Sequence, residues 1–355
     1  MSYFLAFAGF AALIVLHEFG HFLAAKAVGM RVERFSLFFP PLLARVKRGE
    51  TEYAIGAIPL GGYVKISGMN PHEELAPEVA PRAYFRQAPW KRIVVIAAGP
   101  LMNVLVAFAI LWGLFLANGQ PVPAIDRAGL RPPAAQSLRP GDHLVAVDGH
   151  APNGDQLAKL ISSHHCSGRP FPGCRATSPV RITVRRNGRL QSFAITPRYD
   201  PAARRTRIGV AFTVGYEPAG LGRSARLSLD EMWNITSNTA SAIGRIFESK
   251  QRKQLSGVVG IYTVTQQAFA LDVSRALEFL ALISLSLALI NLFPFLPLDG
   301  GHIFWAIAEK LRGRPISFSV LERASVVGFM LVLLLAYVGL SNDIGQLTGS
   351  GIKLR

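Results

Sequence analysis

Four long apolar stretches dominate the pattern of hydrophobic and polar positions along this chain. They run over Tyr3–Val28, Ile93–Ala117, Ala276–Phe295 and Ala324–Leu340. Each is close to the roughly 20 residues that a helix needs to cross the hydrocarbon of a bilayer. The pattern therefore predicts four membrane-spanning helices.

The segment Ala124–Gly215 has a different pattern, with short alternating runs separated by turn residues. Strands are expected at His143–Val147, Val180–Arg185 and Gln191–Thr196, with a helix after the first strand. The last two strands flank Asn187-Gly188, which is a strong signal for a two-residue hairpin turn. We predict a small water-facing α+β domain here, which carries no catalytic constellation of its own.

A second β-like region, Thr51–Gly68, follows the first span. Its β-branched and aromatic residues are interrupted by Pro59, Gly61 and Gly62, which favours a hairpin or looped sheet associated with the membrane. It is either an ordinary cytoplasmic hairpin or an edge strand that pairs with an extended substrate. Further along, Leu229–Phe247 has the spacing of an amphipathic helix that lies on the membrane surface or beside the spans.

Charge predicts the orientation of the spans. Eleven Lys and Arg residues lie between Lys26 and Arg92 and none precedes Lys26, so the N-terminus is expected outside and the first loop in the cytoplasm. Without a basic region before it, the first apolar stretch is expected to be a retained span rather than a cleaved signal. The net charge of +16 fits contact with anionic lipid headgroups better than nucleic acid, since no nucleic-acid-binding motif accompanies it.

The expected architecture is a polytopic α-helical membrane protein with four transmembrane helices, a membrane-associated β-hairpin and one extracytoplasmic α+β domain. Both chain termini are expected outside. The expected segments are a first span (1–28), a cytoplasmic loop (29–92) with the hairpin at about 51–68, a second span (93–117), the extracytoplasmic domain (118–215), an amphipathic helical linker (216–275), a third span (276–300), a second cytoplasmic loop (301–323), a fourth span (324–342) and a C-terminal tail (343–355).

The first span contains the sequence His17-Glu18-Phe19-Gly20-His21. Residues four apart share a helix face, so His17 and His21 can bind one metal ion, with Glu18 beside them as a general base. Such a pattern arises by chance in soluble proteins. Inside a membrane, however, an ionisable side chain costs about 2.5–3.5 kcal/mol, which favours a metal or a polar interior that offsets the cost.

The third span is interrupted by the sequence from Asn291 to His302, which contains Pro294, Pro297 and two glycines. Broken helices at membrane depth are tolerated only inside protein or beside a water-filled cavity. Asp299 is therefore expected to be the third metal ligand, with a helix cap as its alternative role. His302 is a rival ligand that we expect near the metal rather than on it.

Candidate substrate contacts come from four residues. Asn291 is expected to bind a substrate carbonyl or its developing oxyanion, or else to join helices. Asn103, in the second span, either hydrogen-bonds a neighbouring helix or shapes the cavity of the site. Gly61 and Gly62 belong to the possible edge strand.

The only two cysteines, Cys166 and Cys174, enclose a short loop in the predicted external domain. They form either a disulfide or a pair of free thiols. The neighbouring His164 and His165 suggest a second metal site or, more simply, a polar loop.

HEFGH in the first span and NLFPFLPLDGG in a later one resemble the site-2 protease family of intramembrane zinc metalloproteases, peptidase family M50, and within it the bacterial regulator-of-sigma-E-protease group. The motifs GPLMN, LGGYVK, LSGVVGI and LRPGDHLVAVDG occur in family order, so the resemblance covers nearly the whole chain. It implies that His17, His21 and Asp299 hold one zinc ion and that Glu18 is the general base.

The resemblance also implies a multi-pass protein of the bacterial inner membrane. Its substrates would be single-span membrane proteins, such as anti-sigma factors or remnant signal peptides, already cut by an upstream site-1-type protease. The external domain would be a single PDZ-like domain, whose pattern the insertion with Cys166 and Cys174 interrupts. A non-proteolytic membrane scaffold and a metal or proton transporter are the alternative functions; only the enzyme predicts both bound zinc and cleavage.

Overall fold

The computed structural model describes residues 1–70, 73–151, 154–245, 257–314 and 316–348. The chain forms two compact units. The first contains Met1–Leu114 and Ala225–Arg355, and the second contains Phe115–Ser224. The metal-binding motif and the interrupted third span both belong to the first unit, so this unit can be described by itself.

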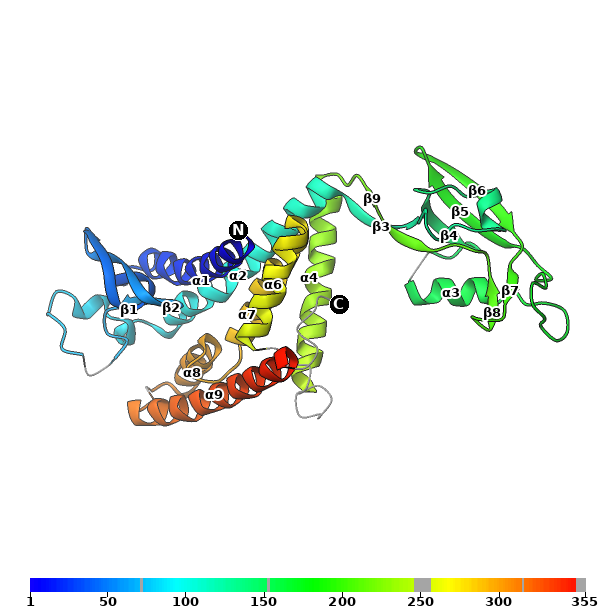
Figure 1. Ribbon diagram of the computed structural model, residues 1–355. Helices are drawn as coiled ribbons and strands as arrows, with labels where there is room; N and C mark the ends of the chain where they lie inside the picture. The colour runs from blue at the N-terminus through cyan, green and yellow to red at the C-terminus, as the bar shows by residue number, and fades with distance from the viewer. Residues whose placement is uncertain (71–72, 152–153, 246–256, 315, 349–355) are drawn as a thin grey trace. The chain divides into compact units, whose positions relative to one another are not determined.

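Seven helices account for most of the first unit's described residues (Figure 1). Four of them are long and apolar enough to cross a membrane: α1 (Ser2–Ala27), α2 (Pro89–Asn118), α7 (Val273–Asn291) and α9 (Phe318–Thr348). The other three are α4 (Leu221–Gly244), α6 (Val258–Leu271) and α8 (Asp299–Arg312). The four predicted spans are thus the four long apolar helices. The chain is a multi-pass membrane protein.

The exposed side chains of α9 show why a bilayer is required. Val327, Phe329, Met330 and Leu334 are at least half exposed in the isolated chain. Lipid tails solvate such groups, and a helix satisfies its own backbone hydrogen bonds, so α9 is stable in hydrocarbon without further cover.

The first loop contains more sheet than predicted. Strand β2 (Thr51–Ile66) is a single element, and its partner is β1 (Val32–Arg48), a segment expected to be loop. Several residues have two partners, since Phe35 is paired with both Val64 and Tyr53. The sheet expected at 51–68 is therefore present, but it is not a hairpin within those bounds. Strand β2 pairs with β1, which starts at residue 32 and contains Pro40 and Pro41, a pair that resembles a loop.

The second expected cytoplasmic loop, 301–323, is also corrected, because it contains most of α8. The third span ends at Asn291, and the chain makes a bend before α8 starts at Asp299. Gly300 and Gly301 allow this bend, since a Cβ on either would collide with the backbone of Leu292 or Leu296. The bend therefore carries Asp299 back toward the spans at the start of a new helix.

The described residues of the expected linker contain two helices, α4 and α6. The predicted helix Leu229–Phe247 lies within α4 as far as Gly244, and Phe247 is outside the described residues. Helix α6 packs against both α1 and α7, and its N-terminus is capped by the buried Asp343 of α9, whose Oδ1 accepts from Gly257 N at 3.0 Å. The expected tail from 343 is therefore helical as far as Thr348.

The second unit is a five-stranded antiparallel sheet in the order β6-β5-β4-β3-β9, with α3 and a two-stranded sheet, β7-β8. Val147, Val180, Ile182 and Val184 lie in its fully buried core. The predicted strands and helix are all present. The bounds are β3 (Gln120–Ile125), β4 (His143–Val147), α3 (Gly154–Ser162), β5 (Val180–Arg186), β6 (Arg189–Ile195), β7 (Arg198–Asp200), β8 (Arg205–Arg207) and β9 (Phe212–Glu217).

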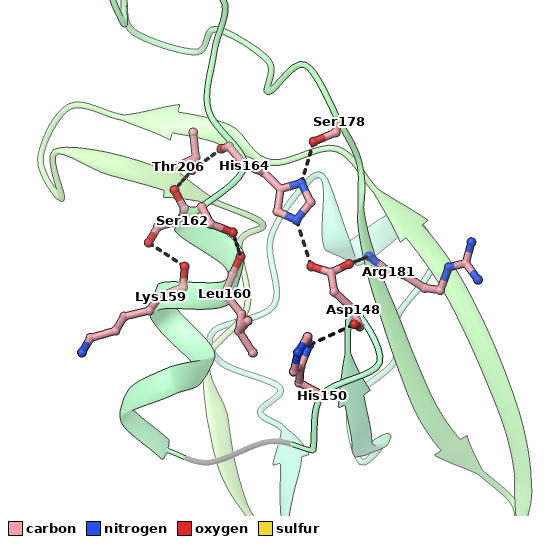
Figure 2. Close-up of polar contacts among 10 residues, drawn as sticks. Asp148, His150, Lys159, Leu160, Ser162, His164, Ser178, Arg181 and Thr206 are labelled. Carbon is pink, nitrogen blue, oxygen red and sulfur yellow. Dashed lines mark hydrogen bonds and ion pairs between the residues drawn. The ribbon is translucent and has the colours of Figure 1, made fainter.

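A disulfide joins Cys166 and Cys174, whose Cα atoms are 6.2 Å apart. Beside it, the ring of His164 is held at both nitrogens, by Ser178 Oγ at 2.8 Å and by Asp148 Oδ2 at 2.9 Å (Figure 2). This chain of hydrogen bonds ties the disulfide loop to the turn after β4. Among the described residues no third metal-ligating side chain joins His164, so the polar-loop interpretation fits and the second-metal interpretation does not.

Candidate metal centre

Three side chains from two helices meet inside the first unit. His17 and His21 lie on one face of α1, and Asp299 is the first residue of α8. The two Nε2 atoms are 3.3 Å apart, and Asp299 Oδ2 is 3.3 Å from that of His17 and 3.4 Å from that of His21. Both histidines are 7% exposed.

These separations match a tetrahedral metal site. Ligand atoms about 2.0–2.1 Å from zinc in tetrahedral geometry are about 3.3 Å from one another. Three nearly equal distances of 3.3–3.4 Å are therefore those expected for three ligands of one ion. Two imidazoles and one carboxylate are also a donor set that zinc accepts in catalytic sites.

Hydrogen bonds behind the ligands turn the correct ring nitrogens inward. Nδ1 of His21 is 2.9 Å from the carbonyl oxygen of Val95, which only accepts, so Nδ1 carries the proton and donates. The lone pair of Nε2 then points at the carboxylate of Asp299, whose Oδ2 is buried and has no hydrogen-bond donor among the described residues. Acceptors facing one another in this way are stabilised by a cation.

Asn103 performs the same task for His17. Its side-chain amide lies 3.2 Å from Nδ1 of His17, and it is completely buried. With the amide turned so that Oδ1 faces the ring, Nδ1–H donates to an oxygen that otherwise has no partner among the described residues. Ser284 of α7 holds this segment by donating to the Asn103 carbonyl at 2.8 Å. Asn103 therefore hydrogen-bonds a neighbouring helix, the first of its two expected roles, and it is buried behind a ligand rather than placed on a substrate surface.

Two glycines let α1 and α2 approach closely enough for these contacts. A Cβ on Gly99 of α2 would collide with the ring of His21 and lie 2.9 Å from Cε1 of His17. A Cβ on Gly20 of α1 would collide with the carbonyl of Ala98. The small residues therefore set the distance between the helices at the level of the metal centre.

Glu18 points toward the sheet of the first loop. Its Cγ is 3.1 Å from the position that a Cβ on Gly62 would occupy, and its carboxylate is within hydrogen-bond reach of the Val64 backbone. Gly61, at a φ of +155°, lies against the ring of Phe39. Strand β2 thus passes directly beside the glutamate of the motif, which the sequence did not reveal.

The remaining candidates fall at different distances from the centre. Nδ2 of Asn291 lies 3.5 Å from Nε2 of His17, so its amide borders the triangle of ligand atoms. His302 is one turn further along α8 and does not join the ligand cluster. Asp299 makes no side-chain cap for α8, whose N-cap is Leu298, so the capping alternative is not what the structure shows.

Sequence reasoning missed three contributors: the Val95 carbonyl, Gly99 and Ser284. A backbone carbonyl carries no sequence signal at all. The glycine stands next to Pro100 in GPLMN, and a glycine within an apolar span is a signal for close helix approach. That signal was available, but the sequence did not identify which helix approaches.

The fold and the site together define a multi-pass membrane protein with a buried two-histidine, one-carboxylate centre, beside which a glutamate stands. This is the arrangement of a metal-dependent hydrolase within a membrane.

Comparison with known proteins agrees. Residues 5–335 match peptidase family M50. A protein of Rhizobium meliloti (strain 1021) is 30% identical, over 95% of this chain and 94% of its own. One from Nostoc sp. is 30% identical over 98% and 97%, and one from Clostridium acetobutylicum 25% identical over 97% and 98%. Each is named "Putative zinc metalloprotease".

The chain belongs to peptidase family M50, the site-2 protease family expected from its motifs. It is a zinc metalloprotease with several membrane spans, and zinc is its metal.

Proposed function

We propose that His17, His21 and Asp299 are the zinc ligands and that Glu18 is the general base of an intramembrane endopeptidase. The observation that carries this proposal is the triangle of ligand atoms with sides of 3.3–3.4 Å, buried between apolar helices. Asn103 and the Val95 carbonyl act as positioning groups that fix both imidazoles with Nε2 inward.

Zinc, when bound, supplies a Lewis acid that polarises a peptide carbonyl and lowers the pKa of water. Glu18 accepts the proton of the attacking water and donates it to the amine that leaves, so the peptide bond breaks and the proton is returned. Asn291 lies close enough to the centre for its amide N–H to hydrogen-bond the oxygen on which negative charge develops.

The substrate is proposed to be a transmembrane segment of a single-span membrane protein. The centre lies within α1, which is apolar on both sides of the motif, so a water-soluble peptide has poor access. A helix hides its carbonyls in internal hydrogen bonds and must unwind first. Strand β2 at Gly61 and Gly62, next to Glu18, offers backbone groups to such an extended segment.

The cellular setting follows the family resemblance. We propose a bacterial inner-membrane location, with both termini and the second unit outside and the β1–β2 region in the cytoplasm, because the basic residues cluster in that loop. The second unit is proposed to be a PDZ-like domain. An upstream site-1-type protease would first trim substrates such as anti-sigma factors or remnant signal peptides.

The test uses purified full-length protein in detergent with a single-span test substrate. Glu18→Gln is expected to retain about one zinc per chain and to lose cleavage by at least 100-fold, as expected for removal of a general base. His17→Ala and Asp299→Ala are expected to lose zinc as well. Cleavage at the wild-type rate by Glu18→Gln would overturn the assignment of the base.

A further inference from the structure

A cavity of about 880 Å³ lies in the first unit, and its wall includes His302 but none of the three ligand side chains. It is an open cavity bounded by the short helix η2 (Tyr84–Arg86), the start of α2, one face of α8 and the start of α9. Its volume is in the range of small-molecule sites. Much of its wall is apolar or aromatic, including Phe85, Leu296, Trp305 and Leu321.

The cavity lies at one surface of the membrane. The chain crosses the bilayer at α1, α2, α7 and α9 in turn, so α2 and α9 begin on the same side. The cavity is bounded by both of these helix starts. Its opening is therefore at the depth where lipid headgroups are concentrated, whichever side of the membrane that is. The Trp and Tyr in its wall are side chains that favour this depth.

Its charged groups favour an anion. Arg92, Lys310 and Arg314 line the cavity, together with Glu309 and Glu322. Glu309 is already engaged, because it pairs with Arg92 and also accepts from the Ile316 backbone N–H at 3.2 Å. Lys310 and Arg314 are exposed, and neither is in an ion pair among the described residues, so two cations face the one remaining carboxylate, that of Glu322.

The buried side chain of Arg92 is a second, independent reason to expect an anion in the cavity. This side chain is only 14% exposed. One end of its guanidinium pairs with Glu309, but Nε is buried and has no acceptor among the described residues. A buried donor of this kind costs free energy unless an oxygen reaches it. An oxygen-rich anionic group in the cavity would supply one.

We propose that this cavity binds one anionic membrane phospholipid. The phosphate lies between Lys310 and Arg314, an oxygen of the head or glycerol region accepts from Arg92 Nε, and an acyl chain covers Leu296 and Leu321. The partner is a lipid rather than free phosphate, because a largely apolar wall would remain uncovered by a small ion. Lipid composition would then act on the enzyme at a specific place, separate from the metal centre.

The experiment titrates the purified full-length protein in mixed micelles with phosphatidylglycerol that carries brominated acyl chains, and follows quenching of tryptophan fluorescence. Trp305 lines the cavity, and loss of the quenched component in Trp305→Phe assigns the signal to it. Brominated phosphatidylcholine, which has no net charge, is the lipid control. Phosphatidylglycerol is expected to quench at a concentration at least tenfold lower.

Two variants test the residues. Lys310→Gln with Arg314→Gln is expected to weaken phosphatidylglycerol binding about 30-fold, at roughly 1 kcal/mol for each cation. The matched control is Lys47→Gln with Arg48→Gln, which removes two exposed charges from β1, outside the cavity, and is expected to change binding less than twofold. Zinc content should stay at the wild-type value in both.

Ser325→Phe fills the cavity without a change of charge and is expected to weaken binding at least tenfold. Four results would overturn the proposal. The first two are equal quenching by both lipids and equal losses of lipid binding in the two double variants. The others are competition by soluble glycerol phosphate at the potency of the lipid, and displacement of the lipid by a single-span substrate peptide that depends on the same two cations. The last would make the cavity a substrate site.

Discussion

Gly99 offers the sharpest test of how the metal centre is built. Replacing it with alanine adds one methyl group on α2 where that helix faces both histidines. The new Cβ would lie 2.9 Å from Cε1 of His17, and closer still to the ring of His21. Carbon atoms in ordinary contact are about 3.5 Å apart, so the His17 ring alone must move by about 0.6 Å.

The helices cannot separate without further loss, because Gly20 and Ala98 are in backbone contact beside the same place. A ring movement of about 0.6 Å exceeds the roughly 0.2 Å within which ligand distances in metal sites vary. It also strains the 2.9 Å bond from His21 to the Val95 carbonyl. Loss of such a supporting contact typically costs 10–100-fold in metal affinity. We expect Gly99→Ala to fall in this range, at about 1.4–2.7 kcal/mol.

The assay is competition for zinc between the purified protein and a fluorescent chelator in detergent, with cleavage measured in parallel. Gly113→Ala is the matched control, because it lies on the same helix and its Cβ meets nothing within 4 Å. It should bind zinc normally and gain up to about 1 kcal/mol of helix stability. Wild-type zinc affinity in Gly99→Ala would refute the packing argument.

Three further predictions concern other contacts. Asn103→Leu should weaken zinc binding about 10–100-fold, because the His17 tautomer is no longer fixed; unchanged affinity in the chelator assay would contradict this. His164→Ala should speed reduction of the disulfide by a mild thiol several-fold, as followed by labelling of the freed cysteines. The control, His165→Ala at the exposed neighbouring position, should not; equal reduction rates in the two variants would show that the His164 hydrogen bonds of Figure 2 do not protect the disulfide. Hydrogen bonds from Arg82 and Lys26 lower the pKa of Glu50 from 4.5 to about 2. Since the pKa is lower in the folded state, this stabilisation is present above pH 4.5 and is lost as the pH falls toward 2. Glu50→Gln should therefore cost about 1 kcal/mol at pH 7 after allowance for exposure, and its deficit in thermal unfolding should shrink by pH 3; a deficit that is constant with pH would exclude the ion pair as its cause.

Much of the fold was predictable because a bilayer imposes simple rules. An apolar stretch of about 20 residues has one stable structure in hydrocarbon, so the four spans followed from the sequence. The Asn187-Gly188 turn likewise fixed the register of β5 and β6, since both residues adopt positive φ, at 50° and 76°. Strand β1 was missed because its pairing with β2 is irregular, with several register shifts, and its two central prolines resemble a loop.

The residues of the metal centre likewise differ in how far the sequence alone predicted them. His17, Glu18 and His21 come from one helical turn, so their common location is a local property that spacing alone predicts. Asp299 was expected from chemistry, as the acid at a broken span. The role of Asn103 was not decided locally, because a buried amide can serve substrate, helix or ligand equally well. Only the position of α2 behind His17 distinguishes these roles.

By itself the sequence determined the number of spans, the donor types of the metal centre and the family, because these depend on hydrophobic length and on residue chemistry. Tertiary structure decided what surrounds that chemistry: the inward-facing ring nitrogens, the close passage of β2 beside Glu18 and the cavity between α2, α8 and α9. Such features arise where segments far apart in the sequence meet, as His21 and Val95 do across 74 residues. Their geometry depends on packing between helices, for which a linear pattern carries no distance.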